Sequence, residues 1–149
     1  MNLLISGCLL GLACRYDGDS RPLPEDVLQA LTKAFHLVPV CPEQLGGLST
    51  PRNPAERVGE RVVSNAGEDV TKEYQKGAQE VLRLAKRLDC RVALLKEKSP
   101  ACGSVLIYDG SFEKNLISGN GVATELLKEN GIRVFGESEL EKLLKKEVG

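Results

Sequence analysis

The sequence is poor in residues on which several common kinds of site depend. It has no tryptophan, three tyrosines and three phenylalanines, which disfavours a protein that binds single-stranded nucleic acid by stacking its bases. It has one histidine, His36, so a zinc site with two histidine ligands is excluded within one chain. Its 20 basic and 21 acidic residues nearly cancel, so the chain lacks the basic excess of a general nucleic-acid or membrane binder.

Long apolar runs are missing too. No stretch approaches the ~18 apolar residues of a transmembrane helix, so no membrane association is expected. Residues 1–7 have no basic segment and their apolar run ends at Ser6, so a secretory signal peptide is not expected. We therefore expect a cytoplasmic protein, in which the five cysteines stay reduced and available as ligands or nucleophiles.

What remains is typical of one globular domain. The 149 residues are 42% hydrophobic and 28% charged, which is enough to bury a substantial core. Apolar runs that read as buried strands cover 3–6, 35–40, 91–95, 105–108 and 132–135. Helical spacing predicts helices that begin near Pro22, Thr71, Val122 and Ser138, the last with a capping box of Ser138 and Glu141.

The order of these segments predicts the fold class. Strands alternate with helices and are apolar on both faces, which is typical of a parallel sheet covered on both sides. Residues 42–69 are rich in proline and glycine and are expected to form one long loop. We predict a single α/β domain over residues 1–149, with three layers and a mostly parallel, Rossmann-like sheet flanked by helices.

Three cysteines follow predicted strands. Cys8 comes just after the first strand, Cys41 directly after the second, and Cys102 in the loop after the third. Because ligands of open α/β sheets bind at the carboxyl ends of the strands, we expect these thiols to share one edge. Three thiolates leave one position open on a zinc ion or on one iron of a 4Fe-4S cluster, and an open metal can act as a Lewis acid.

The other two cysteines have different surroundings. Cys90 lies at a helix-to-strand junction and fits a small, packed hydrophobic side chain. Cys14 is next to Arg15, and three roles stay open for it: a fourth ligand, a resolving thiol or a packed side chain.

Polar residues crowd into the loops that carry the cysteines. Glu43 is a candidate to orient or deprotonate water, and Ser99 to hydrogen-bond a sulfur or a substrate. Taken one by one, such residues are ordinary loop residues, and it is their crowding that indicates a shared site. The candidate substrate-binding residues are Arg15, Asp17, Arg52 and Gly121, the last at a helix start with free N–H groups.

Several motifs together resemble the thiouracil desulfurase (2-thiouracil desulfidase) family. The resemblance spans roughly residues 3 to 136, and Ala101 stands where the family pattern SPSCG has serine. The segments that carry it are 8–11, 14–18, 38–43, 46–52, 96–104, 108–112 and 119–121.

The resemblance implies a desulfurase that depends on a 4Fe-4S cluster. Its ligands would be Cys8, Cys41 and Cys102, which leaves one iron not ligated by protein. The implied reaction removes sulfur from a thiolated pyrimidine such as 2-thiouracil and yields uracil and hydrogen sulfide. We expect a Lewis-acid mechanism without net electron transfer, in which Glu43 assists the attacking water.

The expected substrate is a small thiolated base or nucleoside, because the charge balance and scarce aromatics disfavour a stable nucleic-acid complex. Two other functions stay open. A thiol-based redox or persulfide-handling protein would use Cys8 and Cys14 as its working pair and would need no iron. A non-catalytic module would bind zinc or a thionucleotide without turnover.

Overall fold

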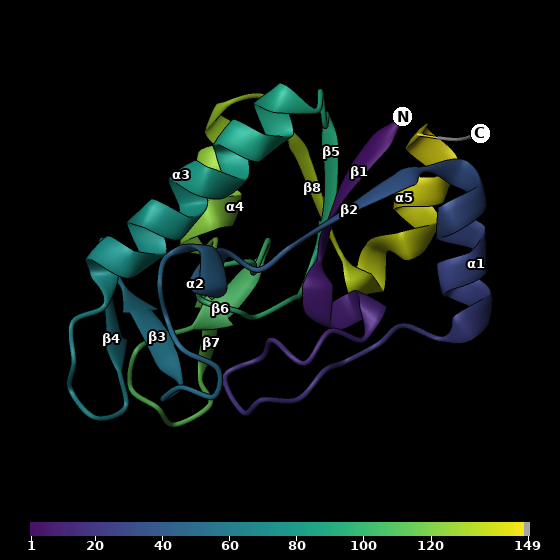
Figure 1. The fold of residues 1–149 in the computed structure, drawn as a ribbon. Coiled ribbons are helices and arrows are strands. Elements are labelled where there is room, and N and C mark those ends of the chain that lie inside the picture. The colour runs from purple at the N-terminus through teal and green to yellow at the C-terminus, as the bar shows by residue number, and fades with distance from the viewer. Residues whose placement is uncertain (148–149) are drawn as a thin grey trace.

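Four parallel strands form the central sheet of the computed structural model, which describes residues 1–147 (Figure 1). Every neighbouring pair in this sheet is parallel. The two central strands are almost entirely buried, which explains their continuous apolar runs. In spatial order the strands are β2 (His36–Val40), β1 (Asn2–Ser6), β5 (Val92–Leu95) and β8 (Arg133–Gly136).

Helices cover both faces of the sheet. Figure 1 shows α1 and α5 on one face and α3 and α4 on the other. In β1, Leu3 and Ile5 pack in the cluster that contains Leu31 of α1, whereas Leu4 packs with Val81 of α3. The predicted three-layer α/β fold is confirmed. The helices are α1 (Glu25–Ala34), α3 (Thr71–Arg87), α4 (Val122–Glu129) and α5 (Leu140–Glu147).

The direction of winding reverses at β1. The chain crosses through α1 to β2 at one edge, and then returns through α3 to β5 on the other side of β1. Open α/β sheets bind ligands outside the strand ends at such a reversal. Here Ser6 Oγ accepts a hydrogen bond of 2.9 Å from the backbone N–H of Lys96, which joins the end of β1 to the end of β5.

Two antiparallel hairpins lie at the carboxyl end of the sheet (Figure 1). The expected loop over 42–69 is wrong, because this segment contains a short helix and the first hairpin. The charged residues of β3 and β4 interrupt any apolar run, so no strand pattern marks them. The elements are α2 (Pro42–Leu45), β3 (Ala55–Val58) paired with β4 (Arg61–Ser64), and β6 (Leu106–Tyr108) paired with β7 (Leu116–Ser118).

Two further details differ from the prediction. The strand expected over 105–108 exists as β6, but it belongs to the second hairpin and not to the parallel sheet. The predicted capping box of Ser138 and Glu141 is wrong, because a 3-10 turn, η2 (Glu137–Glu139), precedes α5. Glu139 Oε1 instead accepts the backbone N–H of Gly136 at 3.0 Å. Within the described residues, every helix is too short or too polar to cross a membrane.

Helices α2 and α3 cross in direct backbone contact. A Cβ on Gly46 would lie 2.0 Å from the carbonyl oxygen of Glu73, and one on Gly77 would lie 1.9 Å from that of Pro42. Only glycine permits this approach. Because Cys41 is the N-cap of α2, the contact determines where the end of β2 and the first turn of α2 lie.

We predict that Gly77→Ala destabilises the protein by about 2–3 kcal/mol, because the new methyl group displaces α2. The gain in helix propensity, about 1 kcal/mol, opposes this loss without cancelling it. Urea denaturation measures the difference. The control is Gln79→Ala, an exposed position on the same helix, which should change stability by less than about 0.5 kcal/mol. Equal stability of both variants would contradict the contact.

Candidate functional site

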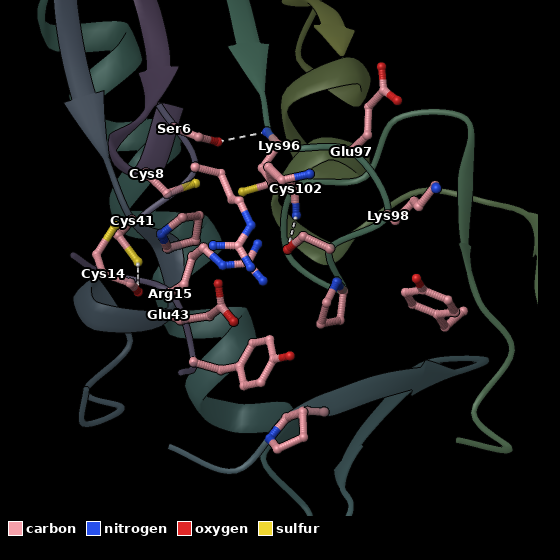
Figure 2. A pocket seen from close by; sticks show the side chains of 18 of the residues that line it. Ser6, Cys8, Cys14, Arg15, Cys41, Glu43, Lys96, Glu97, Lys98 and Cys102 are labelled. Carbon is pink, nitrogen blue, oxygen red and sulfur yellow. Dashed lines mark hydrogen bonds between the residues drawn. The ribbon is translucent and has the colours of Figure 1, made fainter. Parts of the chain in front are cut away.

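A cavity of about 610 Å³ lies at the carboxyl edge of the sheet. Figure 2 shows the thiol-bearing side of this cavity. Cys8, Cys41 and Cys102 all line it, as the strand ends predicted. Cys8 lies in the 3-10 turn η1 (Gly7–Leu10) after β1, Cys41 follows β2, and Cys102 lies in the loop after β5.

The cavity thiols are unpaired and poorly exposed. Burial raises the pKa of Cys8 to about 11, although nearby Lys96 and Arg15 oppose the shift. Burial, followed by the charge of Glu43, also raises the pKa of Cys102 well above its usual value. These two thiols are therefore protonated at neutral pH, and a metal that binds them must displace their protons.

Cys14 lies beside the other cavity thiols. Burial, followed by the nearby Cys41 and Cys8, raises its pKa to about 12. Its carbonyl oxygen accepts hydrogen bonds from Cys41 Sγ at 3.6 Å and from Arg52 Nη2 at 3.0 Å. Cys90, in contrast, is 3% exposed and packs in the core cluster next to α3, as expected for a small hydrophobic side chain.

The donor set is compatible with a bound metal–sulfur group. Four free thiols line the cavity, Cys14 among them, and thiols are soft ligands that favour iron–sulfur clusters, zinc and copper(I). In residues 1–147, no three cysteine, histidine, aspartate or glutamate side chains form a ready site for one metal ion. The thiols are instead distributed around the cavity, whose volume has room for a group larger than a single ion.

Glu43 lies in the first turn of α2 and its side chain is 14% exposed. Its Oε2 accepts a hydrogen bond of 2.9 Å from the hydroxyl of Tyr74 on α3, and lies 3.4 Å from Arg52 Nη2. Both donors therefore engage the same oxygen. Figure 2 shows the carboxylate on the cavity side, next to Arg15. α3 and the loop before β3 thus hold a carboxylate at the cavity wall.

The two predicted arginines differ in what holds them. Arg52 Nη1 donates to Thr50 Oγ1 at 3.0 Å and Nη2 to the Cys14 carbonyl, and its side chain is only 7% exposed. Arg15 also lines the cavity; its Nε lies 3.5 Å from Asp17 Oδ1, and its guanidinium lies 5.4 Å from the centre of the Tyr16 ring. Arg52 is thus committed to internal contacts, whereas Arg15 carries its charge into the cavity.

Ser99 supports the loop that carries Cys102. Its Oγ accepts the backbone N–H groups of Ala101 and Cys102, both at 3.1 Å, and the residue lines the cavity. The Cys102 carbonyl accepts a hydrogen bond of 2.8 Å from Thr124 Oγ1 on α4. These bonds fix the backbone on both sides of the Cys102 thiol.

Two predicted substrate-binding residues do not line the cavity. Asp17 contacts Arg15 and Arg21 from outside. Gly121 donates its N–H to the Gly103 carbonyl at 2.8 Å, and a Cβ there would lie 2.3 Å from the Ala101 carbonyl carbon. Gly121 lets α4 begin against the Cys102 loop. The substrate-binding role of both residues stays a prediction.

Several residues that line the cavity were not predicted from the sequence. Lys96 Nζ pairs with Glu137 Oε2 at 2.9 Å, and both side chains line the cavity. Applying the strand-end rule to every residue that follows β5, and not only to cysteine, would have found Lys96. The two hairpins also contribute to the cavity. Tyr108 and Phe112 belong to segment 108–112 of the family resemblance, but nothing local in the sequence places any hairpin residue at the cavity. The hairpin residues that line it are Ala55, Glu56, Tyr108, Phe112 and Lys114.

The fold and the cavity together define an α/β protein with a thiol-lined site at the switch point of a parallel sheet. A model of the 2-thiouracil desulfurase family matches residues 3–139, and the chain belongs to this family. The family resemblance of the motifs is therefore confirmed over nearly the whole chain.

Two individual proteins are similar to this chain. An uncharacterized protein, YbbK, from Bacillus subtilis (strain 168) is 41% identical over 152 residues, covering 95% of this chain and 99% of the relative. A solved structure of TudS, a 4Fe-4S-dependent thiouracil desulfidase, is 46% identical and superposes with a TM-score of 0.93. That match covers 97% of this chain and 95% of TudS.

We predict that Tyr74→Phe lowers the free energy of unfolding by about 2 kcal/mol, because the Glu43 carboxylate loses a charge-assisted hydrogen bond in a partly buried place. Tyr108→Phe is the matched control. No hydrogen bond of the Tyr108 hydroxyl occurs within residues 1–147, so its removal should cost less than about 0.5 kcal/mol. Urea denaturation of the metal-free protein measures both, and equal effects would contradict the Tyr74–Glu43 contact.

Proposed function

We propose that this protein is an iron–sulfur-dependent desulfurase that removes sulfur from a thiolated pyrimidine such as 2-thiouracil. The observation that carries the proposal is the meeting of three free thiols, from the ends of β1 and β2 and the loop after β5, in one cavity beside a carboxylate. Membership of the 2-thiouracil desulfurase family and the similarity to TudS support it.

Cys8, Cys41 and Cys102 would hold a 4Fe-4S cluster, and three protein ligands would leave one iron without a protein ligand. When bound, the cluster supplies a Lewis-acidic iron that attracts the soft sulfur of a thiocarbonyl group, with no net electron transfer. Lys96 and Arg15, whose charges already favour the Cys8 thiolate, would offset part of the negative charge of the three thiolates.

Glu43 is the residue we assign to the attacking water. Tyr74 and Arg52 both engage its Oε2, which leaves Oε1 to accept a proton from water. The water oxygen adds to the thiocarbonyl carbon, the carbon–sulfur bond breaks, and the proton taken up by Glu43 passes to the departing sulfide. A carbonyl oxygen then stands on the ring carbon in place of the exocyclic sulfur. Water and a thiolated pyrimidine thereby yield the pyrimidine and hydrogen sulfide.

The remaining residues position the substrate and the ligands. Arg15 donates from the cavity wall to a carbonyl oxygen of the pyrimidine, and Asp17 holds its guanidinium from behind. Ser99 holds the Cys102 loop, and its hydroxyl would donate a hydrogen bond to the substrate sulfur. Arg52 acts through Glu43. We propose a small thiolated base or nucleoside as substrate, and the cytoplasm as the place where these thiols stay reduced.

A working pair of Cys8 and Cys14 without iron has less support. Such chemistry needs a thiolate, and burial raises the pKa of Cys8 to about 11 and that of Cys14 to about 12. Reactive cysteines usually have lowered pKa values, so buried thiols of this kind are poor candidates for an iron-free working pair.

We predict that anaerobic reconstitution with iron and sulfide gives a brown protein that releases sulfide from 2-thiouracil or 4-thiouridine. Substituting Cys8, Cys41 or Cys102 by serine should abolish both the visible absorbance and sulfide release, because each removes one ligand. Cys90→Ser is the matched control and should retain both, since Cys90 lies in the core. Sulfide release by iron-free protein, lost on Cys14→Ser, would contradict the cluster and favour the thiol pair.

We predict that Glu43→Gln lowers kcat at least about 100-fold while cluster absorbance and iron content stay unchanged, because the amide cannot accept the proton of water. Glu60→Gln is the control, since that side chain is 90% exposed and lies in the β3–β4 turn. Steady-state sulfide release measures kcat. Activity of the Glu43 variant within a few fold of the wild type would remove Glu43 from the mechanism.

A further inference from the structure

The few aromatic side chains of this chain gather at the cavity. The sequence has three tyrosines and three phenylalanines. Three of them line the cavity, namely Tyr16, Tyr108 and Phe112, whereas Phe35 and Phe135 are buried in the core. In a chain so poor in aromatic residues, this concentration around one cavity needs a reason other than core packing.

Of these aromatic residues, Phe112 is the one whose position is least explained by packing in the core. Its side chain is 38% exposed, and its backbone has φ 59, in the left-handed region that a bulky residue rarely adopts. In residues 1–147, four non-glycine residues have positive φ, and three of these, Lys98, Phe112 and Lys114, line the cavity. Backbone strain of this kind clusters at functional sites, where the surrounding structure maintains it.

The surrounding structure does hold Phe112 firmly. Glu56 Oε1 on β3 accepts the backbone N–H groups of Gly110 at 2.9 Å and of Phe112 at 3.1 Å. A Cβ on Gly110 would lie 2.3 Å from Val58 Cγ2, so the loop packs closely on β3. The exposed ring of Phe112 is therefore carried on a fixed loop at the cavity wall.

We propose that Phe112 is a specificity-determining residue that stacks on the face of the pyrimidine ring. The proposal rests on the proposed function, and it predicts that the cavity prefers thiolated rings to open-chain compounds that carry the same thiocarbonyl group. Every pyrimidine has a π face, and stacking on an aromatic side chain binds that face without reading its substituents. Thiourea has the same thiocarbonyl between two nitrogens but lacks the rest of the ring.

Stacking of this kind binds the ground state and the transition state alike. Its loss should therefore raise KM and leave kcat nearly unchanged. A residue needed only for folding, or for holding the thiols, would instead alter cluster content or kcat. The division of the effect between KM and kcat therefore distinguishes a stacking role from a structural one.

The test compares Phe112→Ala with Leu116→Ala in the reconstituted holoenzyme. Leu116 lies on the same hairpin and is also 38% exposed, but it does not line the cavity. Phe112→Ala should raise KM for 2-thiouracil about tenfold, near the lower end of the loss when a stacked base loses its aromatic partner. Because alanine adopts the same left-handed backbone at the same cost, the variant removes the ring and not the strain.

The conservative variant Phe112→Tyr keeps a stacking ring and should restore the wild-type KM. Leu116→Ala should leave KM, kcat and cluster absorbance unchanged. Calorimetric titration with uracil gives a readout without turnover, and its Kd should rise about tenfold in Phe112→Ala only. Thiourea, used as a competitor or substrate, should not distinguish Phe112→Ala from the wild type.

Unchanged KM and unchanged uracil affinity in Phe112→Ala would overturn the stacking role, and so would equal losses in Phe112→Ala and Leu116→Ala. A wild-type holoenzyme that releases no sulfide would overturn the proposed function instead. In that case weaker uracil binding by Phe112→Ala alone would still support the stacking role, so the two failures are distinguishable.

Discussion

The parallel register of β1 with its two neighbours is the constraint on which the site depends. Ser6 at the end of β1 pairs with Val40 at the end of β2, so Cys8 and Cys41 leave the sheet at the same edge. The bond from Lys96 N–H to Ser6 Oγ brings the end of β5 to that edge as well. A shift of one residue in the pairing of β1 with β2 or with β5 would turn the side chains of the shifted strand to the opposite face of the sheet. The thiols at the strand ends would then be separated.

Polar groups around the cavity are held from behind by other polar groups. Tyr74 and Arg52 hold Glu43, and Glu137 holds Lys96. Buried polar groups are costly unless they are hydrogen-bonded, so these supports let a charged cavity wall exist next to the core. The site therefore depends on α3, which carries Tyr74, and on the segment before α5, which carries Glu137.

The sequence was sufficient to predict the α/β class, the parallel sheet and the edge at which Cys8, Cys41 and Cys102 lie. It was sufficient because the strands are continuous apolar runs and the cysteines follow them directly. It was insufficient for β3 and β4, whose charged residues interrupt the apolar pattern. It also did not place Phe112 at the cavity, because residues of β3 far away in sequence hold the loop of Phe112. The hydrogen bond from the Tyr74 hydroxyl to Glu43 could not be predicted either, because Tyr74 has the helical spacing of an ordinary core residue.

The thiols that line the cavity come from three separate crossovers of the chain, and this has a consequence for biosynthesis. A nascent chain that has emerged only through α2 carries Cys8, Cys14 and Cys41 but neither β5 nor the loop of Cys102. β5 is also the strand beside β1, so this edge of the sheet cannot form before β5 has been synthesised. The three thiols can therefore meet only after Cys102 has been synthesised, about two-thirds of the way along the chain, and the sheet itself is complete only when β8 follows.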